Sequence, residues 1–374
     1  MSCKQKNLVR SANQNEKSVT CEKYSSDSYI PHSDNNCQSF YSENHEFHSK
    51  FIPKKEKTEI LSKSFYRIGE DRRAERVSNC GSYLAFAHEV DYSGVISEKG
   101  KLHNANFCRE RLCPMCIWRR TLKIYGQVSQ IMCNMPKDIH YLFLTLTVPN
   151  CTADSFQETI DRLFKSWVKF YKNKKFKNAV LGYYRVLEVT RNRKNGTYHP
   201  HFHIILAVIP SYFQGKYYIN HDDFLNMWRK AYGDDSISQV DIRKIKARDK
   251  CLSETSDLSD LDGFKSIEGA VAEVAKYAVK DEDFIFKDNE LMDSVVKTLL
   301  YGLKGRRLVQ FGGLFKEVAQ RLNLDDVEDG DLIHLDDDKI NSAVAHMIIK
   351  YGWRSGTYQI ISKEIKKVGD CDEM

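Results

Sequence analysis

The stretch that most constrains this chain is YHPHFHIILAV, at residues 198–208. In an extended strand, successive side chains point to opposite faces. Phe202 and Ile204 therefore lie on one face, and three imidazoles lie on the other: His199, His201 and His203. Three aligned imidazoles are typical of a metal or catalytic site rather than of a core, although an exposed strand that is merely His-rich is the alternative.

A second predicted strand, at residues 185–191, precedes this one. Asn195-Gly196 between them is a strong signal for a two-residue β-hairpin turn. If those two residues form the turn, Glu188 lies opposite His203, so that a carboxylate joins the imidazoles. Neutral imidazoles combined with one oxygen donor and open positions indicate a catalytic metal site.

The charge of the chain is unevenly distributed. The formal net charge is +6, yet residues 325–338 hold eight acidic residues and neither Lys nor Arg. The positive excess gathers in four runs: 169–177, 191–194, 243–250 and 304–307. Basic runs interleaved with aromatic residues favour a polyanionic partner such as DNA. A single run would more often be a solvated surface.

Targeting signals are absent from the sequence. The sequence contains no run of about twenty apolar residues that could span a membrane, and its N-terminus lacks the apolar segment of a signal peptide. We therefore expect a cytoplasmic protein with no membrane partner and with reduced cysteines. Residues 1–60 are rich in polar residues and poor in aliphatic ones, which predicts a disordered or loosely ordered segment.

Four of the 11 cysteines have a spacing that suits a metal: Cys80, Cys108, Cys113 and Cys116. Two thiolates of a C-x2-C turn plus two from elsewhere can form a structural zinc site. The alternative is a set of buried reduced thiols that pack as small hydrophobic groups. The following residues 117–125 are predicted to form a helix with a basic face.

The remaining periodic segments predict an α+β protein with a central antiparallel sheet and flanking helices. Residues 141–148 alternate as a strand that ends before Pro149. Apolar residues recur at helical spacing in 156–171. A short helix at 222–232 and a strand at 240–245 follow.

A second stretch with chemical potential is the predicted helix at residues 267–280. Its apolar stripe is expected to pack against the sheet and consists of Ile267, Val271, Val274, Ala275 and Ala278. Glu273, Tyr277 and Lys280 then share another side of the helix. A phenol can be a nucleophile where nearby cations or metal offset its pKa near 10, and a carboxylate one turn away can take a proton. Taken alone, the stretch is an ordinary amphipathic helix.

Together these segments resemble the three motifs of rolling-circle plasmid replication initiators. The motifs are FLTLT at 143–147, HPHFH at 199–203, and the Glu273, Tyr277 and Lys280 spacing. The resemblance is to the Rep family of small Gram-positive plasmids, within the His-hydrophobic-His (HUH) endonuclease superfamily. It extends over roughly residues 75–335, which include the CGSYLAF and ANFCRERLCPMCIWRR segments.

The resemblance implies a role for each matching residue. His201 and His203 match the pair that binds Mg²⁺ or Mn²⁺. Tyr277 matches the nucleophile that nicks the double-strand origin, leaving a 5′-phosphotyrosine and a free 3′-OH. Glu273 matches the carboxylate that activates water for the terminating cleavage. Lys280 is expected to stabilise phosphate or phenolate, although a solvated lysine is an equal alternative.

The other expected site residues follow from position. Glu188 ranks above His199 as a third metal ligand because of the hairpin register. Three residues at the hairpin are expected to contact DNA: Arg191, Arg193 and Lys194. The resemblance implies an HUH-like fold, double-strand origin DNA and single-stranded DNA as partners, and a host helicase and DNA polymerase. It leaves open whether the protein forms a homodimer.

We expect four segments: a loose N-terminal segment at 1–60, a cysteine-rich subdomain at 61–125, a nickase and strand-transferase domain at 126–300, and a basic-then-acidic region at 301–374. Two rival functions stay open. A relaxase or single-tyrosine transposase would share the chemistry. A non-catalytic zinc-dependent DNA-binding regulator would use the cysteines and leave the HPHFH motif and Tyr277 unexplained.

Overall fold

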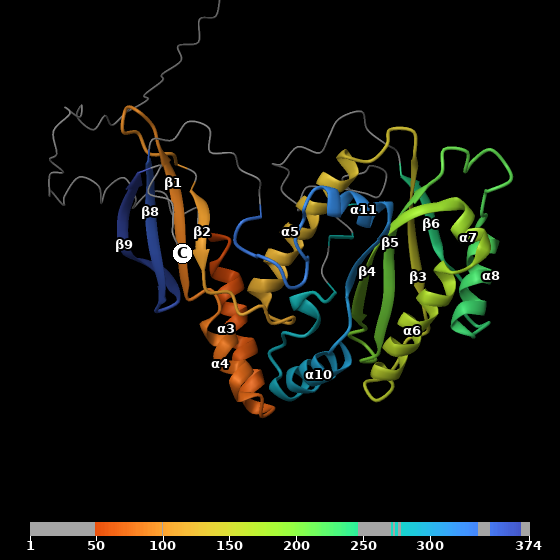
Figure 1. Ribbon diagram of the computed structural model, residues 1–374. Coiled ribbons are helices and arrows are strands. Elements are labelled where there is room, and N and C mark those ends of the chain that lie inside the picture. The colour runs from red at the N-terminus through yellow and green to blue at the C-terminus, as the bar shows by residue number, and fades with distance from the viewer. Residues whose placement is uncertain are drawn as a thin grey trace, which may run out of the picture.

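The computed structural model describes residues 49–98, 100–245, 271, 274–275, 278–335 and 345–367. Over these residues the chain is an α+β protein with two antiparallel sheets, as the sequence predicts. In Figure 1 the sheets lie at opposite ends of the molecule, with several helices between them. None of the helices in the described ranges is long and apolar enough to cross a membrane.

The larger sheet has the strand order β6-β3-β5-β4-β7, with β5 in the middle. Its members are β3 (His140–Thr147), β4 (Val180–Arg191), β5 (Tyr198–Val208), β6 (Asp241–Ile245) and β7 (Val309–Gly313). Helices α6 (Phe156–Tyr171), α7 (Lys174–Ala179) and α8 (His221–Tyr232) accompany it in Figure 1. The ring of Phe202 on β5 packs edge-on against Phe164 of α6, with centroids 5.3 Å apart. The apolar face of β5 is thus buried under α6.

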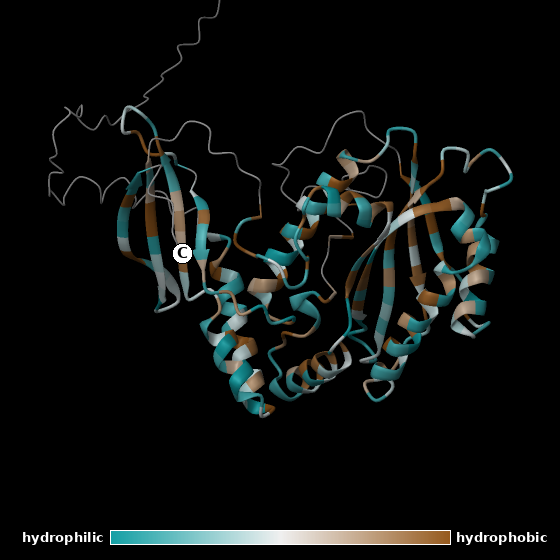
Figure 2. Cartoon of the chain, in the orientation of Figure 1, coloured by the Kyte–Doolittle hydropathy of each residue, from teal (hydrophilic) through white to brown (hydrophobic). Residues whose placement is uncertain are grey.

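The periodic segments of the sequence fold as predicted. The strand expected at 141–148 is β3, the helix expected at 156–171 is α6, and the segments at 222–232 and 240–245 are α8 and β6. Trp167 and Trp228 are fully buried, so they belong to the core. In Figure 2, bands of hydrophobic residues cross the strands of both sheets.

The smaller sheet joins segments from both ends of the described chain, in the order β2-β1-β8-β9. It consists of β1 (Tyr83–Val90), β2 (Lys101–Ala105), β8 (Ala345–Arg354) and β9 (Thr357–Lys367). Helices α3 (Ile52–Arg67) and α4 (Asp71–Asn79) precede β1. The cysteine-rich segment therefore shares a sheet with residues 345–367, which our division of the chain assigned to a separate C-terminal region.

The expected segment boundaries at residues 60, 125 and 300 each fall inside a helix. These helices are α3, α5 (Pro114–Cys133) and α10 (Asn289–Gly302). The helix α3 begins inside the segment predicted to be loose. Thr58 and Leu61 of this helix are fully buried against neighbouring elements, and this packing stabilises it. Residues 1–48 lie outside the described residues, and the prediction for them stays a prediction.

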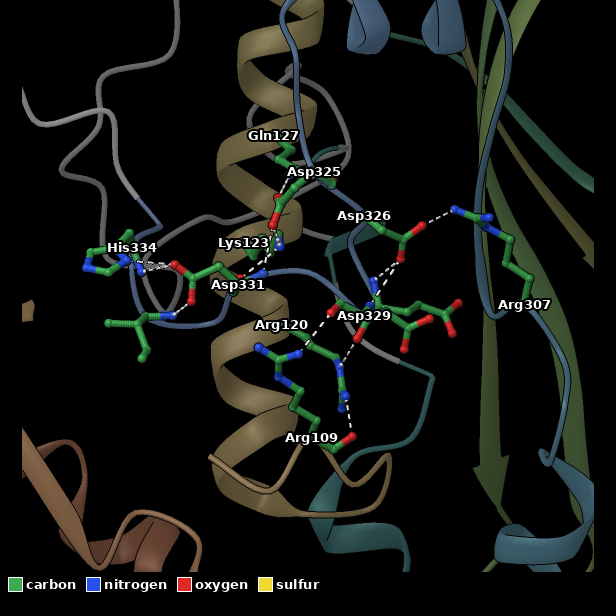
Figure 3. Close-up of polar contacts among 12 residues, drawn as sticks. Arg109, Arg120, Lys123, Gln127, Arg307, Asp325, Asp326, Asp329, Asp331 and His334 are labelled. Carbon is green, nitrogen blue, oxygen red and sulfur yellow. Dashed lines mark hydrogen bonds and ion pairs between the residues drawn. The ribbon is translucent and has the colours of Figure 1, made fainter. Parts of the chain in front are cut away.

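The basic face predicted for α5 does not face solvent. Arg119, Arg120 and Lys123 are at most 8% exposed, and an acidic strap, residues 325–335, covers them. Figure 3 shows Lys123 and Gln127 paired with Asp325, and Arg120 bonded to the strap backbone. The strap follows α11 (Leu314–Arg321). It pairs Lys123 with Asp325 and bonds Arg119 and Arg120 through backbone carbonyls, so the basic face predicted for this helix is covered.

Candidate metal centre and its surroundings

Three donor side chains meet on the larger sheet: Glu188 of β4, and His201 and His203 of β5. The Nε2 atoms of the two imidazoles are 3.1 Å apart. Glu188 Oε2 lies 2.8 Å from Nε2 of His203 and 3.3 Å from Nε2 of His201. All three are less than 9% exposed. Burial alone would raise the pKa of Glu188, but its contacts with both imidazoles outweigh it and hold the pKa well below the usual range.

The ring orientations leave metal-binding nitrogens facing the centre. Nδ1 of His201 lies 3.0 Å from the carbonyl oxygen of His199, and a carbonyl only accepts, so Nδ1 carries the proton and Nε2 presents its lone pair. Nδ1 of His203 lies 3.1 Å from Oγ1 of Thr145 on β3, and this hydroxyl oxygen can accept a hydrogen bond from the Nδ1–H group. Outer partners of this kind fix metal-ligating imidazoles.

The spacing of these donors fits a divalent cation. Two ligand atoms that each lie about 2.1 Å from an ion such as Mg²⁺, at right angles around it, are about 3.0 Å from each other. The three measured separations, 2.8, 3.1 and 3.3 Å, bracket that value. With one carboxylate and two imidazoles, the group leaves coordination positions free for water or substrate, which is the arrangement of a catalytic site.

The hairpin register differs from the prediction. Arg191 pairs with Tyr198, so the loop holds residues 192–197 instead of Asn195-Gly196 alone, and Glu188 lies opposite His201. The Asn192 backbone N–H donates to Thr197 O at 2.8 Å, which closes the longer loop. The register moves by two residues, and a shift by two keeps side chains on the same face. Glu188 therefore still meets the imidazoles.

His199 lies beside the donor group but is not one of its three members. Its Nδ1 is 2.7 Å from Oδ1 of Asn150, and its ring centroid is 5.1 Å from that of His201. Burial and the neighbouring His201 lower the pKa of His199. In this geometry it contributes its backbone carbonyl, which orients His201.

The apolar stripe predicted at residues 267–280 packs as expected, but the helix does not extend to residue 280: of the described residues there, 271, 274 and 275 are helical, whereas 278–280 are not, so Lys280 follows the helix. Val271, Val274, Ala275 and Ala278 are fully buried, which confirms these members of the apolar stripe. Tyr184 on β4 donates to Val274 O at 3.1 Å, and the Val189 N–H donates to Ala278 O at 2.8 Å. Glu273, Tyr277 and Ile267 lie outside the described residues.

Lys280 comes from the same segment and reaches the metal centre. Its Nζ is 3.1 Å from Oε1 of Glu188, while Oε2 of that carboxylate faces the imidazoles. The two oxygens thus have separate partners. An ammonium group at this place can orient Glu188 and can also contact a phosphate bound nearby.

The four cysteines form a second candidate metal site. Sγ of Cys80 is 3.6 Å from Sγ of Cys116 and 3.5 Å from Sγ of Cys113, and Cys108 is 3.7 Å from Cys116. Four sulfurs around Zn²⁺ at about 2.3 Å are about 3.8 Å apart. The backbone N–H groups of Cys108 and Glu110 donate to Cys80 and Cys108 sulfurs, as in zinc knuckles.

Two contributors to these centres carried no role in the sequence analysis. Thr145 belongs to the FLTLT motif on β3 and lies directly opposite His203 of β5, so the two side chains share one face of the sheet. Lys55 of α3 is 1% exposed, and burial lowers its pKa, although Glu59 and, to a smaller extent, the nearby cysteines act in the opposite direction. Its position beside the thiols suits charge compensation of thiolates, and no pattern in the sequence signals it.

The expected DNA-contacting residues lie at the end of the hairpin. Arg191 is the last residue of β4, while Arg193 and Lys194 are exposed in the loop that follows. Of the basic run at 304–307, Arg306 and Arg307 instead form ion pairs with Asp161 and Asp326. The run at 243–250 is described only as far as residue 245.

Fold and site together define an α+β protein that carries a candidate divalent-metal centre on its central antiparallel sheet. A family model described as "Replication protein" matches residues 99–359 of the chain. A "Protein rep" of Bacillus amyloliquefaciens is 36% identical over 297 residues, 78% of this chain and 85% of that protein. Those of Streptococcus pneumoniae and Staphylococcus aureus are 36% and 32% identical, covering 74% and 64% of this chain and 81% and 96% of theirs. No solved structure matches it.

The chain belongs to this family of Rep replication proteins. The match confirms the resemblance to plasmid rolling-circle initiators that the motifs indicate.

Proposed function

We propose that this plasmid replication protein is a metal-dependent endonuclease that nicks the double-strand origin and starts rolling-circle replication. The observation that carries the proposal is the buried group of Glu188, His201 and His203, with Nδ1 of His201 held by a carbonyl. The packing of Val274 and Ala278 against β4 supports it, because these residues flank the motif that contains Tyr277. We propose Mg²⁺ or Mn²⁺ as the ion.

The proposed reaction is a transesterification. The Tyr277 phenolate oxygen attacks the scissile phosphorus, a bond between tyrosine and the 5′ phosphate forms, and the bond to the 3′ oxygen breaks. The leaving oxygen takes a proton and becomes a 3′-OH that a host polymerase can extend, once a host helicase separates the strands. A divalent ion bound by the two imidazoles and Glu188 would neutralise charge that develops on the phosphate.

Other residues are assigned supporting roles. We propose that Glu273 takes a proton from the water that attacks in the terminating cleavage. Lys280 forms an ion pair of 3.1 Å with Glu188 and so orients this carboxylate, and we propose that its ammonium charge also attracts the phosphate. Arg191, Arg193 and Lys194 are proposed to bind the DNA backbone, which makes affinity salt-sensitive.

We further propose that the four cysteines bind a structural Zn²⁺. Sulfur separations of 3.5 to 3.7 Å support this, and the buried ammonium group of Lys55 near these cysteines would compensate negative charge on the thiolates. In the same segment, Cys113 precedes the first residue of α5 and Cys116 lies in its first turn. The zinc site would therefore hold the start of α5 against α4.

The test uses supercoiled DNA of the replicon, purified protein and Mn²⁺. We expect an open-circular product and a protein–DNA adduct that survives denaturant and maps to Tyr277. Tyr277→Phe should abolish both and leave DNA binding intact. The matched control is Tyr92→Phe, because Tyr92 is 90% exposed and should nick at the wild-type rate.

A normal nicking rate in Tyr277→Phe would reject the nucleophile. Specific binding without any nick or adduct would reject the endonuclease and favour the zinc-dependent regulator, whose centre would be the cysteines. Sequence-specific nicking of transfer or transposon ends, without activity at the plasmid origin, would favour a relaxase or a transposase.

A further inference from the structure

Helix α3 is fixed on one side to the cysteine-rich segment. Oγ1 of Thr58 lies 3.8 Å from Sγ of Cys113, and the buried ammonium group of Lys55 donates to Ser78 O. Leu61, one turn after Thr58, is fully buried. Close-packed elements of this kind do not shift freely, so α3 forms a rigid base for the groups that bind its adjoining side.

A carboxylate from a distant part of the chain binds that adjoining side of α3. Oδ2 of Asp281 lies 3.0 Å from Nζ of Lys57 and 3.4 Å from Nζ of Lys54. The Asp281 side chain is only 10% exposed, although it lies 224 positions after Lys57 in the chain. Removing a carboxylate from water is costly unless cations compensate its charge. The two lysines provide this compensation and so fix where Asp281 lies.

Asp281 directly follows Lys280, the residue that reaches the metal centre. Nζ of Lys280 lies 3.1 Å from Oε1 of Glu188, but the Lys280 side chain is 46% exposed. Since an ion pair this exposed contributes little by itself, the place of Lys280 depends on how the backbone beside it is held. Asp281 holds that backbone, because its side chain binds α3 and its carbonyl accepts from the Ile285 N–H at 2.9 Å.

A second contact with α3 holds the chain further on. Arg67, the last residue of α3, donates through Nε and Nη2 to the two carboxylate oxygens of Asp293, both at 2.7 Å. Asp293 belongs to α10, which lies close to α3 in Figure 1. Paired bonds between a guanidinium and a carboxylate fix orientation as well as distance. Helix α3 therefore braces the chain that follows Lys280 at two places, residues 281 and 293.

We propose that Asp281 is a positioning residue for the cleavage: held by Lys57 and Lys54 of α3, it keeps Lys280 at the Glu188 carboxylate. The inference rests on the proposed function and adds the contact that keeps its site assembled. Asp281 lies outside the three sequence motifs, and α3 precedes residues 99–359, which the family model matches. The brace therefore comes from a part of the chain that this match does not cover.

The first test separates the cleavage rate from DNA binding. At saturating origin DNA, Asp281→Ala should lower the single-turnover nicking rate about tenfold, because small displacements of reacting groups slow a reaction strongly. The Kd for origin DNA, measured by fluorescence anisotropy in EDTA, should not change. Asp281→Glu, which keeps the charge, should restore most of the rate. The matched control is Glu282→Ala, at the exposed next residue, which should nick as wild type.

A double-mutant cycle tests whether Asp281 acts through Lys280. Lys280→Gln should slow nicking, and adding Asp281→Ala to it should slow nicking little further, since both changes break the same chain of contacts.

A second readout needs neither DNA nor cleavage. The Val189 N–H donates to Ala278 O at 2.8 Å, which joins β4 to the segment that Asp281 holds. Hydrogen exchange of the peptide that contains Val189 should therefore be faster in Asp281→Ala than in wild type, because this bond opens more often. Exchange in Glu282→Ala should match wild type.

A further variant covers the case in which Asp281→Ala is unstable. The double variant Lys54→Gln/Lys57→Gln changes two side chains that are 31% and 35% exposed, so it should fold normally. It should slow nicking and speed exchange in the same way. Lys63→Gln, at an exposed position of α3, is its control.

Wild-type nicking and exchange in both Asp281→Ala and the double lysine variant would overturn the inference. So would a full tenfold loss on top of Lys280→Gln, or a loss of Tm and DNA affinity in parallel with nicking that Asp281→Glu does not restore. The proposed function fails separately: a wild-type protein that never nicks origin DNA, but whose exchange rises in Asp281→Ala, rejects the endonuclease and leaves the brace in place.

Discussion

The two donor groups of this protein differ in chemistry and in construction. The cysteine group offers four soft sulfur donors, close to α4, the start of α5 and the loop between β2 and α5. The group of Glu188, His201 and His203 offers three harder donors from two adjacent strands of one sheet. Four thiolates complete a tetrahedral shell, whereas one carboxylate and two imidazoles leave positions open.

With the proposed ions bound, this difference would separate a stabilising site from a catalytic site within one chain. A closed shell can only hold its surroundings together, so its free energy of metal binding adds to the free energy of unfolding. The open group is held by contacts within the protein itself: the register of the sheet, Thr145 and Lys280. Removing each ion should therefore have opposite consequences.

The largest expected effect is on stability at the cysteine group. Cys113→Ser should abolish stoichiometric zinc binding and lower the free energy of unfolding by roughly 3 kcal/mol, several degrees in Tm. Zinc content is measured by mass spectrometry and Tm by calorimetry. Cys133→Ser, at an exposed cysteine, is the control and should change neither. Full stability with no zinc in the wild-type protein would mean that the thiols merely pack.

His203→Ala should lower the nicking activity rather than the stability. Loss of one of three ligands should lower the nicking rate at least a hundredfold, about 2.7 kcal/mol, while the Tm without added metal stays close to wild type. Nicking at several Mn²⁺ concentrations is compared with His221→Ala, an exposed histidine outside the centre. Unchanged Mn²⁺ stimulation in His203→Ala would remove this residue from the site.

Thr145 is expected to act through His203. Thr145→Val removes the oxygen that lies 3.1 Å from Nδ1 of His203, and loss of such an outer partner typically costs ten- to a hundredfold in metal affinity. Titration with Mn²⁺ should give a raised Kd that Thr145→Ser restores. If Thr145 had only a structural role, Thr145→Val would lower Tm, and Thr145→Ser would not restore the affinity for Mn²⁺.

The smallest expected effect is on the free energy of unfolding, from a substitution in the acidic strap, residues 325–335. Asp325→Asn weakens an ion pair at 2.7 Å with Lys123, whose side chain is 4% exposed, but the Asp325 side chain is 48% exposed. We therefore expect a loss of only about 1 kcal/mol in urea unfolding. Asp222→Asn, with a side chain 88% exposed, should change nothing measurable. A loss of nicking without a loss of stability would show that the strap acts on the metal centre.

The sequence determined the elements and the donor types. Period-two alternation in β3 and β5, and helical spacing in α6, arise from local chain geometry, which is why these elements were predicted almost to the residue. The same alternation placed His201, His203 and Glu188 on one face even though the loop length was misjudged. An error of two residues in register moves side chains along a strand without turning them over.

Tertiary structure alone decided what lies next to these elements. From the sequence alone, the cations of α5 predict an exposed basic face, because the residues that bind them, 325–335, lie about 200 positions away in the chain. The pairing of β1 with β8 likewise joins distant segments. Local patterns carry no information on such contacts, since burial of charge is favourable only when a specific partner is brought to it by the rest of the fold.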